Sequence, residues 1–390
     1  MKNKILTFTK TAIAVLAIVG AATGCSPTDP TEPTDPNTTV PTEEPTSTPT
    51  VEPNYYFETY KNPLIPRGGT GQKYMAEAPD PSIVRGDDGY WYAVTTGNGG
   101  GKMFRSADCC SWKVHLERVI PRPTWGDNGG DTPNVWAPDL VKIQDKWIYY
   151  YSLSGWGNPI GVGYAVADQV EGPYEDKGKL VTCAELGLDN AIDPCLFVEE
   201  DAVYMALGSF QGIDLIELTL DGMSVKGNPK ENKTLIAGSY GGWNGAETEG
   251  SYIIKKDEYY YYFGSMGTCC QGANSTYKVV VARSKDIKGP YIDDQKKSMV
   301  GDGGTGKVVC WASAGNGNYY GPGHNSVFQD DAGDYWLFYH AFTKDDNFSV
   351  RHLMMDKLLW DENGWPYVHG EGKFKPSYNE ELDGPRWLDA

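Results

Sequence analysis

The chain has 390 residues, 40% of them hydrophobic, so it can bury a sizeable core and is not disordered throughout. Its 52 acidic and 34 basic side chains give a net charge of −18, which would repel a polyanion at long range. This charge argues against nucleic acid as a partner and favours a neutral one. The high counts of Tyr (26), Trp (12) and Gly (47) favour an all-β fold.

Residues 1–24 have the features of a bacterial lipoprotein signal peptide. Lys2 and Lys4 form a basic start, Ala12–Ala22 is an apolar stretch, and a small-residue Ala-Thr-Gly site precedes Cys25. This arrangement resembles a lipobox, with alanine where leucine is more usual. We therefore expect Cys25 to be lipidated and to anchor the mature chain on the extracellular side of a bacterial membrane. Ordinary secretion and an uncleaved anchor are the alternatives.

Residues 25–53 comprise the lipidated cysteine and a linker. Residues 26–53 contain eight Pro, nine Thr and six acidic residues but no Lys or Arg. Proline keeps such a segment extended, and the carboxylates repel one another. We expect this linker to hold the folded domain, residues 54–390, away from the membrane. No other stretch reaches the roughly 18 apolar residues that a transmembrane helix needs, so the anchor is the only predicted membrane attachment.

Seven cysteines remain once Cys25 is set aside. They are Cys109, Cys110, Cys183, Cys195, Cys269, Cys270 and Cys310. The two adjacent pairs lack the C-x-x-C spacing of zinc sites. An exported location permits one or two disulfides, whose connectivity the sequence leaves open. Because seven is odd, at least one thiol is expected to stay free.

An internal repeat organises the folded region. Five segments begin with a short apolar strand, followed by a turn and, about ten residues after the start, by an aromatic and β-branched strand. They start at Asp80-Pro-Ser-Ile-Val, Ala137-Pro-Asp-Leu-Val, Asp193-Pro-Cys-Leu-Phe, Glu249-Gly-Ser-Tyr-Ile and His324-Asn-Ser-Val-Phe. Further strands are expected at residues 161–168, 213–220 and 277–284, so each unit holds about four. The pattern predicts an all-β, five-bladed β-propeller, with its closing strand unassigned. A β-sandwich with accidental self-similarity is the alternative.

The first residues of the five segments are the candidate site. In a propeller the innermost strands surround a central axis, so equivalent positions of different blades converge there. Four of the five residues are ionisable: Asp80, Asp193, Glu249 and His324, whereas the second segment has Ala137. Unpaired buried charges are costly, so this convergence needs a chemical reason. Three carboxyls around a cavity suit glycoside hydrolysis, which needs an acid and a base about 6.5–9.5 Å apart for inversion. A structural metal site is the alternative.

Six motifs in this order resemble glycoside hydrolase family 43, most closely its arabinan endo-1,5-α-L-arabinosidases. They are Ala78-Pro-Asp80-Pro-Ser-Ile, Val135-Trp-Ala-Pro-Asp139, Asn190-Ala-Ile-Asp193-Pro, Glu249-Gly-Ser-Tyr, Cys269-Cys-Gln-Gly…Ser275-Thr-Tyr-Lys and Gly321-Pro-Gly-His324-Asn-Ser. The resemblance spans roughly residues 75–365 and implies a five-bladed propeller of an inverting enzyme. It implies that Asp80 is the general base, Glu249 the general acid, and Asp193 the residue that tunes the pKa of the acid and orients the substrate.

The resemblance also implies residues around the sugar. Asn190, Ser209 and the backbone near Gly157 would line the sugar subsite together with Asp80 and Asp193. His324 would lie on the axis beneath the sugar, where some family members hold a calcium ion, here mostly water-ligated, or a water cluster. Trp136 either stacks on a sugar ring or fills the core between blades.

Other polar residues near these motifs have competing interpretations. Glu247 is a rival acid, but only Glu249 falls in the repeated position. Asp139 lies two residues beyond that position and is expected to cap a turn. His340 and His352 lie outside it and are expected to be structural.

The sequence therefore predicts a lipid-anchored, monomeric hydrolase of a neutral plant cell-wall polysaccharide or oligosaccharide, α-1,5-linked L-arabinan. One alternative is an exo-acting α-L-arabinofuranosidase or β-xylosidase of the same fold. Another is a surface carbohydrate-binding propeller without activity. Endo action needs an open groove and exo action a pocket, and the loops at residues 97–101 and 126–134 decide between them.

Overall fold

Strands dominate the computed structural model, which describes residues 54–65, 77–97, 99–126, 134–155, 158–240, 247–301, 303–312 and 317–388. They belong to a compact unit that runs from Tyr55 to Ala390. The predictions for the signal peptide, for Cys25, for the linker to residue 53 and for Gly157 lie outside the described residues. No helix in the described part is long and apolar enough to cross a membrane.

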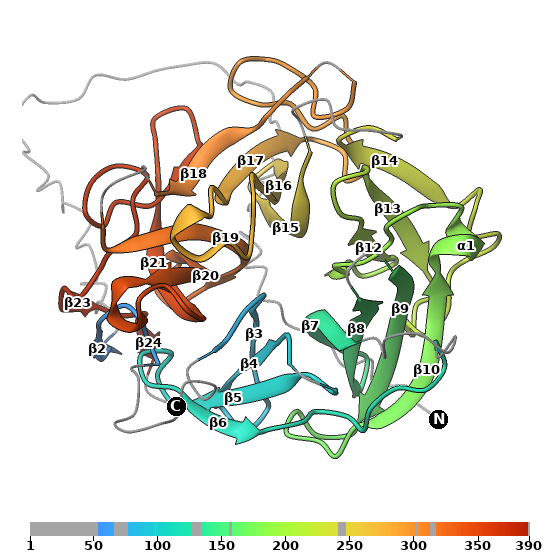
Figure 1. Ribbon diagram of the computed structural model, residues 1–390, viewed down its shortest axis with the longest axis horizontal. Helices are drawn as coiled ribbons and strands as arrows, with labels where there is room; N and C mark the ends of the chain where they lie inside the picture. The colour runs from blue at the N-terminus through green and yellow to red at the C-terminus, as the bar shows by residue number, and fades with distance from the viewer. Residues whose placement is uncertain are drawn as a thin grey trace, which may run out of the picture. The chain divides into compact units, whose positions relative to one another are not determined.

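Five antiparallel sheets, each of four consecutive strands, stand around a common centre (Figure 1). Blade 1 holds β3 (Ser82–Arg85), β4 (Trp91–Thr95), β5 (Lys102–Ser106) and β6 (Lys113–Leu116). Blade 2 holds β7 (Asn134–Ile143), β8 (Lys146–Gly155), β9 (Asn158–Ala167) and β10 (Glu175–Thr182). Blade 3 holds β11 (Cys195–Val198), β12 (Val203–Leu207), β13 (Ile213–Leu218) and β14 (Lys233–Ala237). Blade 4 holds β15 (Glu249–Lys256), β16 (Tyr259–Met266), β17 (Lys278–Ser284) and β18 (Lys307–Trp311). Blade 5 holds β19 (Tyr319–Gln329), β20 (Tyr335–Thr343), β21 (Arg351–Trp360) and β22 (Pro366–Tyr367).

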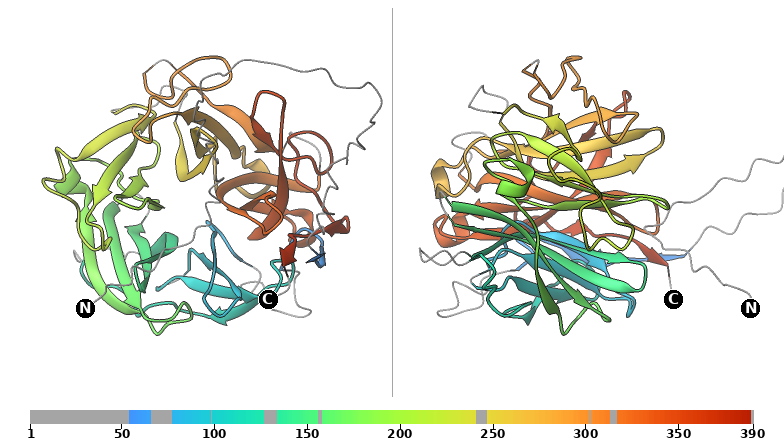
Figure 2. Two further views of the ribbon diagram at one scale, coloured as in Figure 1. Left: turned by 180° about the vertical axis from the view of Figure 1, so that it is seen from behind. Right: turned by 90° about the vertical axis from the view of Figure 1, so that its right-hand side faces the viewer.

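This architecture confirms the predicted all-β, five-bladed propeller and its repeated hairpin. The first strand of each blade contacts the first strand of a neighbouring blade, which places these five strands innermost. The described helical turns are short: α1 (Cys183–Leu186), η1 (Gly272–Asn274) and η2 (Lys344–Asp346). Figure 2 shows the blades from behind and from the side.

Blades 2 and 4 share the same turn after their third strands. In each, a Gly-Pro-Tyr turn buries its tyrosine. The Tyr174 hydroxyl donates to the Val170 carbonyl at 2.7 Å, and the Tyr291 hydroxyl donates to the Ile287 carbonyl at 2.9 Å. A buried hydroxyl needs such a partner, so the same four-residue spacing fixes the same turn twice.

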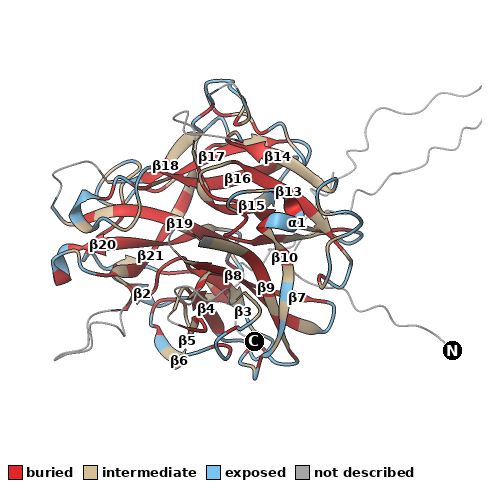
Figure 3. Cartoon of the chain, turned by 45° about the vertical axis from the view of Figure 1, so that its right-hand side comes forward, coloured by how far each residue is buried: buried red, intermediate tan, exposed pale blue. Residues whose placement is uncertain are grey.

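The core lies between neighbouring blades, where apolar faces of adjacent sheets meet (Figure 3). Between blades 1 and 2, for example, Tyr92 and Met103 pack with Trp147 and Tyr149. Successive side chains of a strand point to opposite faces of its sheet. A run of apolar residues therefore supplies both faces, as a sheet buried on two sides requires. The aromatic second strands are therefore mainly packing elements.

Among the described strands, each of the five blades is built from consecutive strands, and the ring closes through the terminal segments. β1 (Tyr55–Tyr56) pairs with β24 (Trp387–Leu388), and β2 (Thr59–Tyr60) pairs with β23 (Leu382–Asp383), in two separate two-stranded sheets. A single cluster of buried residues joins these terminal segments to blades 1 and 5. It includes Tyr60, Trp91, Phe104, Trp336, Leu353 and Trp387. The two ends of the compact unit thus hold the first and last blades together through apolar packing.

Candidate active site

A left-handed residue lies just before or within the innermost strand of every blade. The residues and their φ angles are Asp80 (57°), Ala137 (36°), Asp193 (58°), Gly250 (59°) and His324 (48°). The sequence alignment placed Glu249 in this set, and that alignment is wrong by one residue in blade 4. The equivalent position there is held by Gly250, which tolerates this φ without strain. Glu249 lies one residue earlier, so its side chain leaves the backbone from a different point.

The backbone N–H at this position usually donates to a side chain of the preceding blade. Asp80 donates to His340 Nδ1 at 3.1 Å, Ala137 to Thr96 Oγ1 at 2.7 Å, Asp193 to Ser152 Oγ at 2.8 Å and His324 to Ser265 Oγ at 2.7 Å. His340, Ser152 and Ser265 lie in the second strands of their blades, where they pair with the innermost strand. Thr96 directly follows β4, two residues after Val94, which pairs with Ser82. The polar side chains of one blade therefore align the next.

Blade 4 departs from this pattern where the candidate acid lies. The equivalent second-strand position of blade 3 is Gly208, which has no side chain to accept a hydrogen bond. The Gly250 N–H donates instead to Asp193 Oδ2 at 3.2 Å. This substitution of partners places the Asp193 carboxylate against the backbone directly after Glu249.

The Asp80 carboxyl is buried beside the Arg351 guanidinium, the Thr96 hydroxyl and two imidazoles. Thr96 donates to Oδ2 at 2.6 Å, and Oδ1 lies 3.4 Å from Arg351 Nη1 and 3.4 Å from His324 Nδ1. Burial favours the neutral acid, but the charge of the Arg351 guanidinium outweighs it and holds the pKa of Asp80 well below its usual range. Asp80 is therefore ionised at neutral pH.

The two imidazoles beside Asp80 are neutral. Burial lowers the pKa of His340 to about 4 and also lowers the pKa of His324, against the attraction of the Asp80 carboxylate. The positive charge that faces Asp80 consequently comes from Arg351.

The half-buried Glu249 carboxyl has a different environment. Ser209 Oγ donates to Oε2 at 2.7 Å, and the Tyr277 hydroxyl donates to Oε1 at 2.8 Å. Burial raises the pKa of Glu249 and the Asp80 charge raises it further, which outweighs the two donors and leaves the pKa at about 7. Glu249 therefore holds a proton well above the ordinary carboxyl range.

Asp193 is buried between the other two carboxyls. Burial raises its pKa well above the usual value, and the charges of Glu249 and Asp80 raise it further. Because Asp193 and Glu249 interact strongly, they titrate as a pair, and the pair retains a proton near neutral pH. The structure thus brings together Asp80, Asp193 and Glu249, the three carboxyls selected from the sequence.

Four further residues hold these carboxyls, and the sequence analysis assigned none of them to the site. They are Thr96, Tyr277, His340 and Arg351. His340 was expected to be structural, and its structural role lies at the site: its ring contacts Asp80 Oδ1 at 3.2 Å and stacks on Tyr277 with ring centroids 5.8 Å apart. The position of His340 in the repeat is shared with Thr96 and Ser265, and this shared position is the sequence signal that could have indicated its place at the site. Arg351 comes from a third strand, where the repeat offers no comparison.

Two of the predicted sugar-subsite residues, Asn190 and Ser209, hold the Glu249 side chain in place. Asn190 Nδ2 donates to the Ser209 carbonyl at 3.0 Å, and the Ser209 N–H donates to the Asn190 carbonyl at 3.2 Å. This reciprocal pair fixes Ser209, whose hydroxyl binds Glu249. Trp136 lies half-buried in β7 next to Ala137.

Glu247 and Asp139, the other two acidic residues considered for the site, lie elsewhere in the structure. Glu247 lines a hollow with Phe210, Met266 and Thr268. Asp139 does not cap a turn: it lies within β7, where Oδ1 accepts from Ser82 Oγ at 2.6 Å and Oδ2 from the Leu196 N–H at 2.7 Å. Asp139 therefore ties three innermost strands together. His352 is fully buried, 3.4 Å from Asp346, which agrees with a structural role.

The surroundings of His324 fit a metal ion poorly. Within the described ranges, no group of three or more His, Cys, Asp or Glu side chains could hold one. His324 Nδ1 faces Asp80, whose charge is already balanced by Arg351. Calcium prefers several oxygen ligands, so these residues could hold at most an ion bound mainly by water.

Three carboxyls at the centre of a five-bladed propeller, one ionised and one protonated near neutral pH, define a glycoside hydrolase. The chain belongs to glycosyl hydrolases family 43, whose sequence pattern matches residues 74–366. This membership confirms the family that the motifs indicated.

Similar proteins share most of the folded region. The extracellular exo-α-(1→5)-L-arabinofuranosidase of Cellvibrio japonicus is 33% identical over 75% of this chain and 87% of its own. The extracellular endo-α-(1→5)-L-arabinanase 1 of Bacillus subtilis is 32% identical over 74% of this chain and 86% of its own. The solved structure of Cellvibrio cellulosa α-L-arabinanase with arabinohexaose is 29% identical, covers 75% of this chain and 96% of its own, and has a TM-score of 0.64.

Proposed function

We propose that this protein is an inverting endo-arabinanase that cleaves α-1,5-linked L-arabinan. The observation that carries the proposal is the pairing of an ionised Asp80, held by Arg351, with a Glu249 whose pKa lies at about 7. Relatives named as arabinanases, one solved with a neutral oligosaccharide, support the substrate. The net charge of −18 also suits a neutral polymer rather than an acidic one.

Each group has a defined task in the proposed reaction. The Asp80 carboxylate accepts a proton from water as the water oxygen bonds to the anomeric carbon. Glu249 donates its proton to the glycosidic oxygen as the bond between that oxygen and the anomeric carbon breaks. Asp193, fixed by the Gly250 N–H, keeps the pKa of Glu249 raised and orients the sugar. Inversion follows because water attacks the face opposite the departing oxygen.

Endo action is the proposal, and exo action on arabinan or xylo-oligosaccharides is the second candidate because one similar protein is an exo-arabinofuranosidase. Early products from linear and branched arabinan and from xylo-oligosaccharides test this choice. Endo action releases a range of arabino-oligosaccharides and lowers the viscosity early. One short product from chain ends would contradict it. No turnover on any of these glycans, with retained binding, would instead indicate a carbohydrate-binding propeller.

Asp193→Asn is expected to lower activity and to shift the basic limb of the pH profile toward lower pH. The acid must be protonated to act, so activity falls as pH rises through its pKa, which is about 7 for Glu249. Removing the negative neighbour lets Glu249 lose its proton more easily. The measurement is kcat against pH on arabinan. An unshifted basic limb would contradict the tuning role.

We propose that Cys25 is lipidated and that one lipid group tethers the monomeric enzyme to the outer face of a membrane, which keeps released sugars near the cell. The small-residue site before Cys25 supports this, and the similar proteins are named extracellular. Cys25→Ser should move the protein from the membrane fraction to the soluble fraction. The same distribution for both forms would disprove the anchor.

A calcium ion near His324 remains a proposal with a small expected effect. Because His324 is the one predicted protein ligand, chelation should lower activity only in part. His324→Ala should lower it in the same way if the ring positions the ion or a water. Full activity of both the chelated wild type and His324→Ala would exclude the ion and the axial role together.

A further inference from the structure

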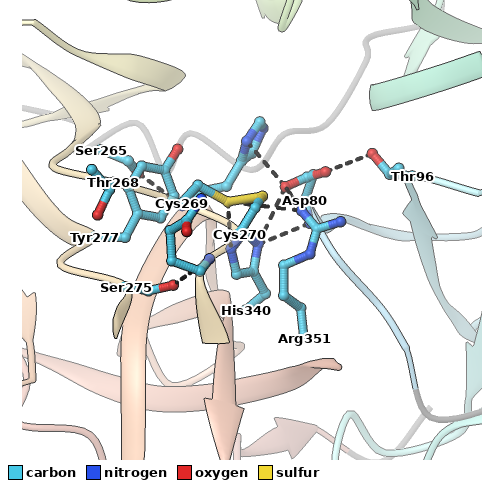
Figure 4. Close-up of a disulfide and its surroundings, with 12 residues drawn as sticks. Asp80, Thr96, Ser265, Thr268, Cys269, Cys270, Ser275, Tyr277, His340 and Arg351 are labelled. Atoms are coloured by element: carbon cyan, nitrogen blue, oxygen red, sulfur yellow. Dashed lines mark hydrogen bonds and ion pairs between the residues drawn. A yellow bond between two sulfur atoms is a disulfide. The ribbon is translucent and has the colours of Figure 1, made fainter. Parts of the chain in front are cut away.

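The adjacent residues Cys269 and Cys270 form a disulfide in the loop between β16 and β17. Figure 4 shows this bond beside Asp80, His340 and Arg351. The other cysteines of the described residues are buried and form no disulfide, namely Cys109, Cys110, Cys183, Cys195 and Cys310. The expectation of one or two disulfides with at least one free thiol is thus confirmed, and the disulfide in the described part of the chain borders the active site.

This disulfide contributes little to the stability of the fold. A disulfide restricts the unfolded chain more when it closes a longer loop, and bonding neighbours closes the shortest one. Hydrogen bonds already hold the surrounding loop: the Thr268 N–H donates to Thr276 Oγ1 at 3.0 Å, and the Gln271 N–H donates to Ser275 Oγ at 2.9 Å. The reason for the bond therefore lies in what its sulfur atoms contact.

Cys269 Sγ contacts two of the side chains that hold Asp80. It lies 3.9 Å from Arg351 Nη1 and 4.0 Å from His340 Nε2. The same Arg351 nitrogen lies 3.4 Å from Asp80 Oδ1. His340 Nδ1 accepts the Asp80 N–H, so the neutral ring carries its proton on Nε2, which faces the sulfur. Both groups are thus held between Asp80 and Cys269.

The oxidised state of Cys269 suits these two donors. A disulfide sulfur carries no proton and no charge, so it can only accept, weakly, from the Arg351 and His340 N–H groups. A thiol would add a competing donor. A thiolate, which the neighbouring guanidinium would favour, would draw Arg351 away from Asp80.

We propose that the Cys269–Cys270 disulfide is a positioning element that fixes Arg351 and His340 against Asp80. The proposal rests on the proposed function in taking Asp80 as the base. Opening the bond displaces the groups that hold Asp80 but removes no predicted sugar contact. It therefore lowers kcat and leaves KM nearly unchanged.

The test compares kcat and KM on linear arabinan for wild type, for Cys269→Ser/Cys270→Ser, and for a control, Cys110→Ser. Cys110 also has a cysteine neighbour, but it belongs to the core between blades 1 and 5. Each form is assayed before and after treatment with a water-soluble phosphine. The phosphine becomes its oxide with oxygen from water, and each sulfur gains one electron and one proton to become a thiol.

Reduction of wild type and of Cys110→Ser should lower kcat roughly ten-fold, since small displacements of reacting groups are costly. KM should change less than about two-fold, because substrate contacts remain. The double variant should start at the lowered kcat and not respond to the phosphine. Reoxidation should restore kcat in wild type. If the double variant does not fold, this cycle of reduction and reoxidation in wild type is the test.

Three results would overturn the proposal. They are free thiols at Cys269 and Cys270 in peptides prepared without reductant, an unchanged kcat after reduction, and a raised KM at constant kcat, which would mean a sugar contact instead. If oxidised wild type cleaves another glycoside but not arabinan, the proposed substrate fails. The same comparison is then made on that glycoside.

Discussion

Asp80→Ala is expected to abolish most activity on every substrate, by about 10²–10⁴-fold, because activation of water is needed whatever the leaving group is. The structure isolates this carboxylate as the ionised one: Thr96 donates to one oxygen, and Arg351 lies beside the other. The measurement is kcat/KM on arabinan and on an aryl arabinoside that wild type hydrolyses.

Asp87→Ala is a suitable control for this variant. Asp87 is an exposed carboxylate of the same blade, paired with Lys142 at 2.7 Å. It should retain wild-type activity on both substrates. Turnover of the aryl substrate by Asp80→Ala at the wild-type rate would show that another group activates the water.

Glu249→Ala is expected to lose about 10²–10⁴-fold on arabinan but to retain measurable turnover on an aryl arabinoside with an acidic phenol. A sugar alkoxide is a poor leaving group and needs a proton, whereas an acidic phenolate leaves without one. The same variant should lose the basic limb of the pH profile on the aryl substrate, since the group that titrates at about 7 is gone.

Glu247→Ala is the matched control, because Glu247 is the rival acid two residues away and lines a hollow with Phe210 and Met266. It should behave as wild type on both substrates. If Glu247→Ala lost arabinan activity while Glu249→Ala kept it, the two glutamates would have to exchange roles.

The fold could be predicted from the sequence because its signals are local and repeated. Each innermost hairpin has apolar strands separated by a turn, and five copies at similar spacing indicate a propeller. Ring closure could not be predicted in this way. It depends on short terminal strands, such as β1 with β24, that lie far apart in the sequence and follow no repeat.

The candidate site was predictable where the repeat could be compared and not elsewhere. Asp80 and Asp193 share the left-handed position, whereas Glu249 was selected through an alignment displaced by one residue. Arg351 comes from a third strand, and no local sequence pattern sets it apart from the other Lys and Arg residues on strands. The pair Cys269-Cys270 was visible, but only its folded surroundings show that it faces Arg351.

Proton NMR of the first-formed sugar tests the division of labour between Asp80 and Glu249 most directly. A base and an acid on separate blades that act on opposite faces of one sugar must invert the anomeric carbon. Arabinan digested in the spectrometer should therefore release reducing ends that are initially in the β configuration, before mutarotation. Reducing ends that first appear in the α configuration would mean retention, with one carboxylate acting as a nucleophile, and would contradict the account.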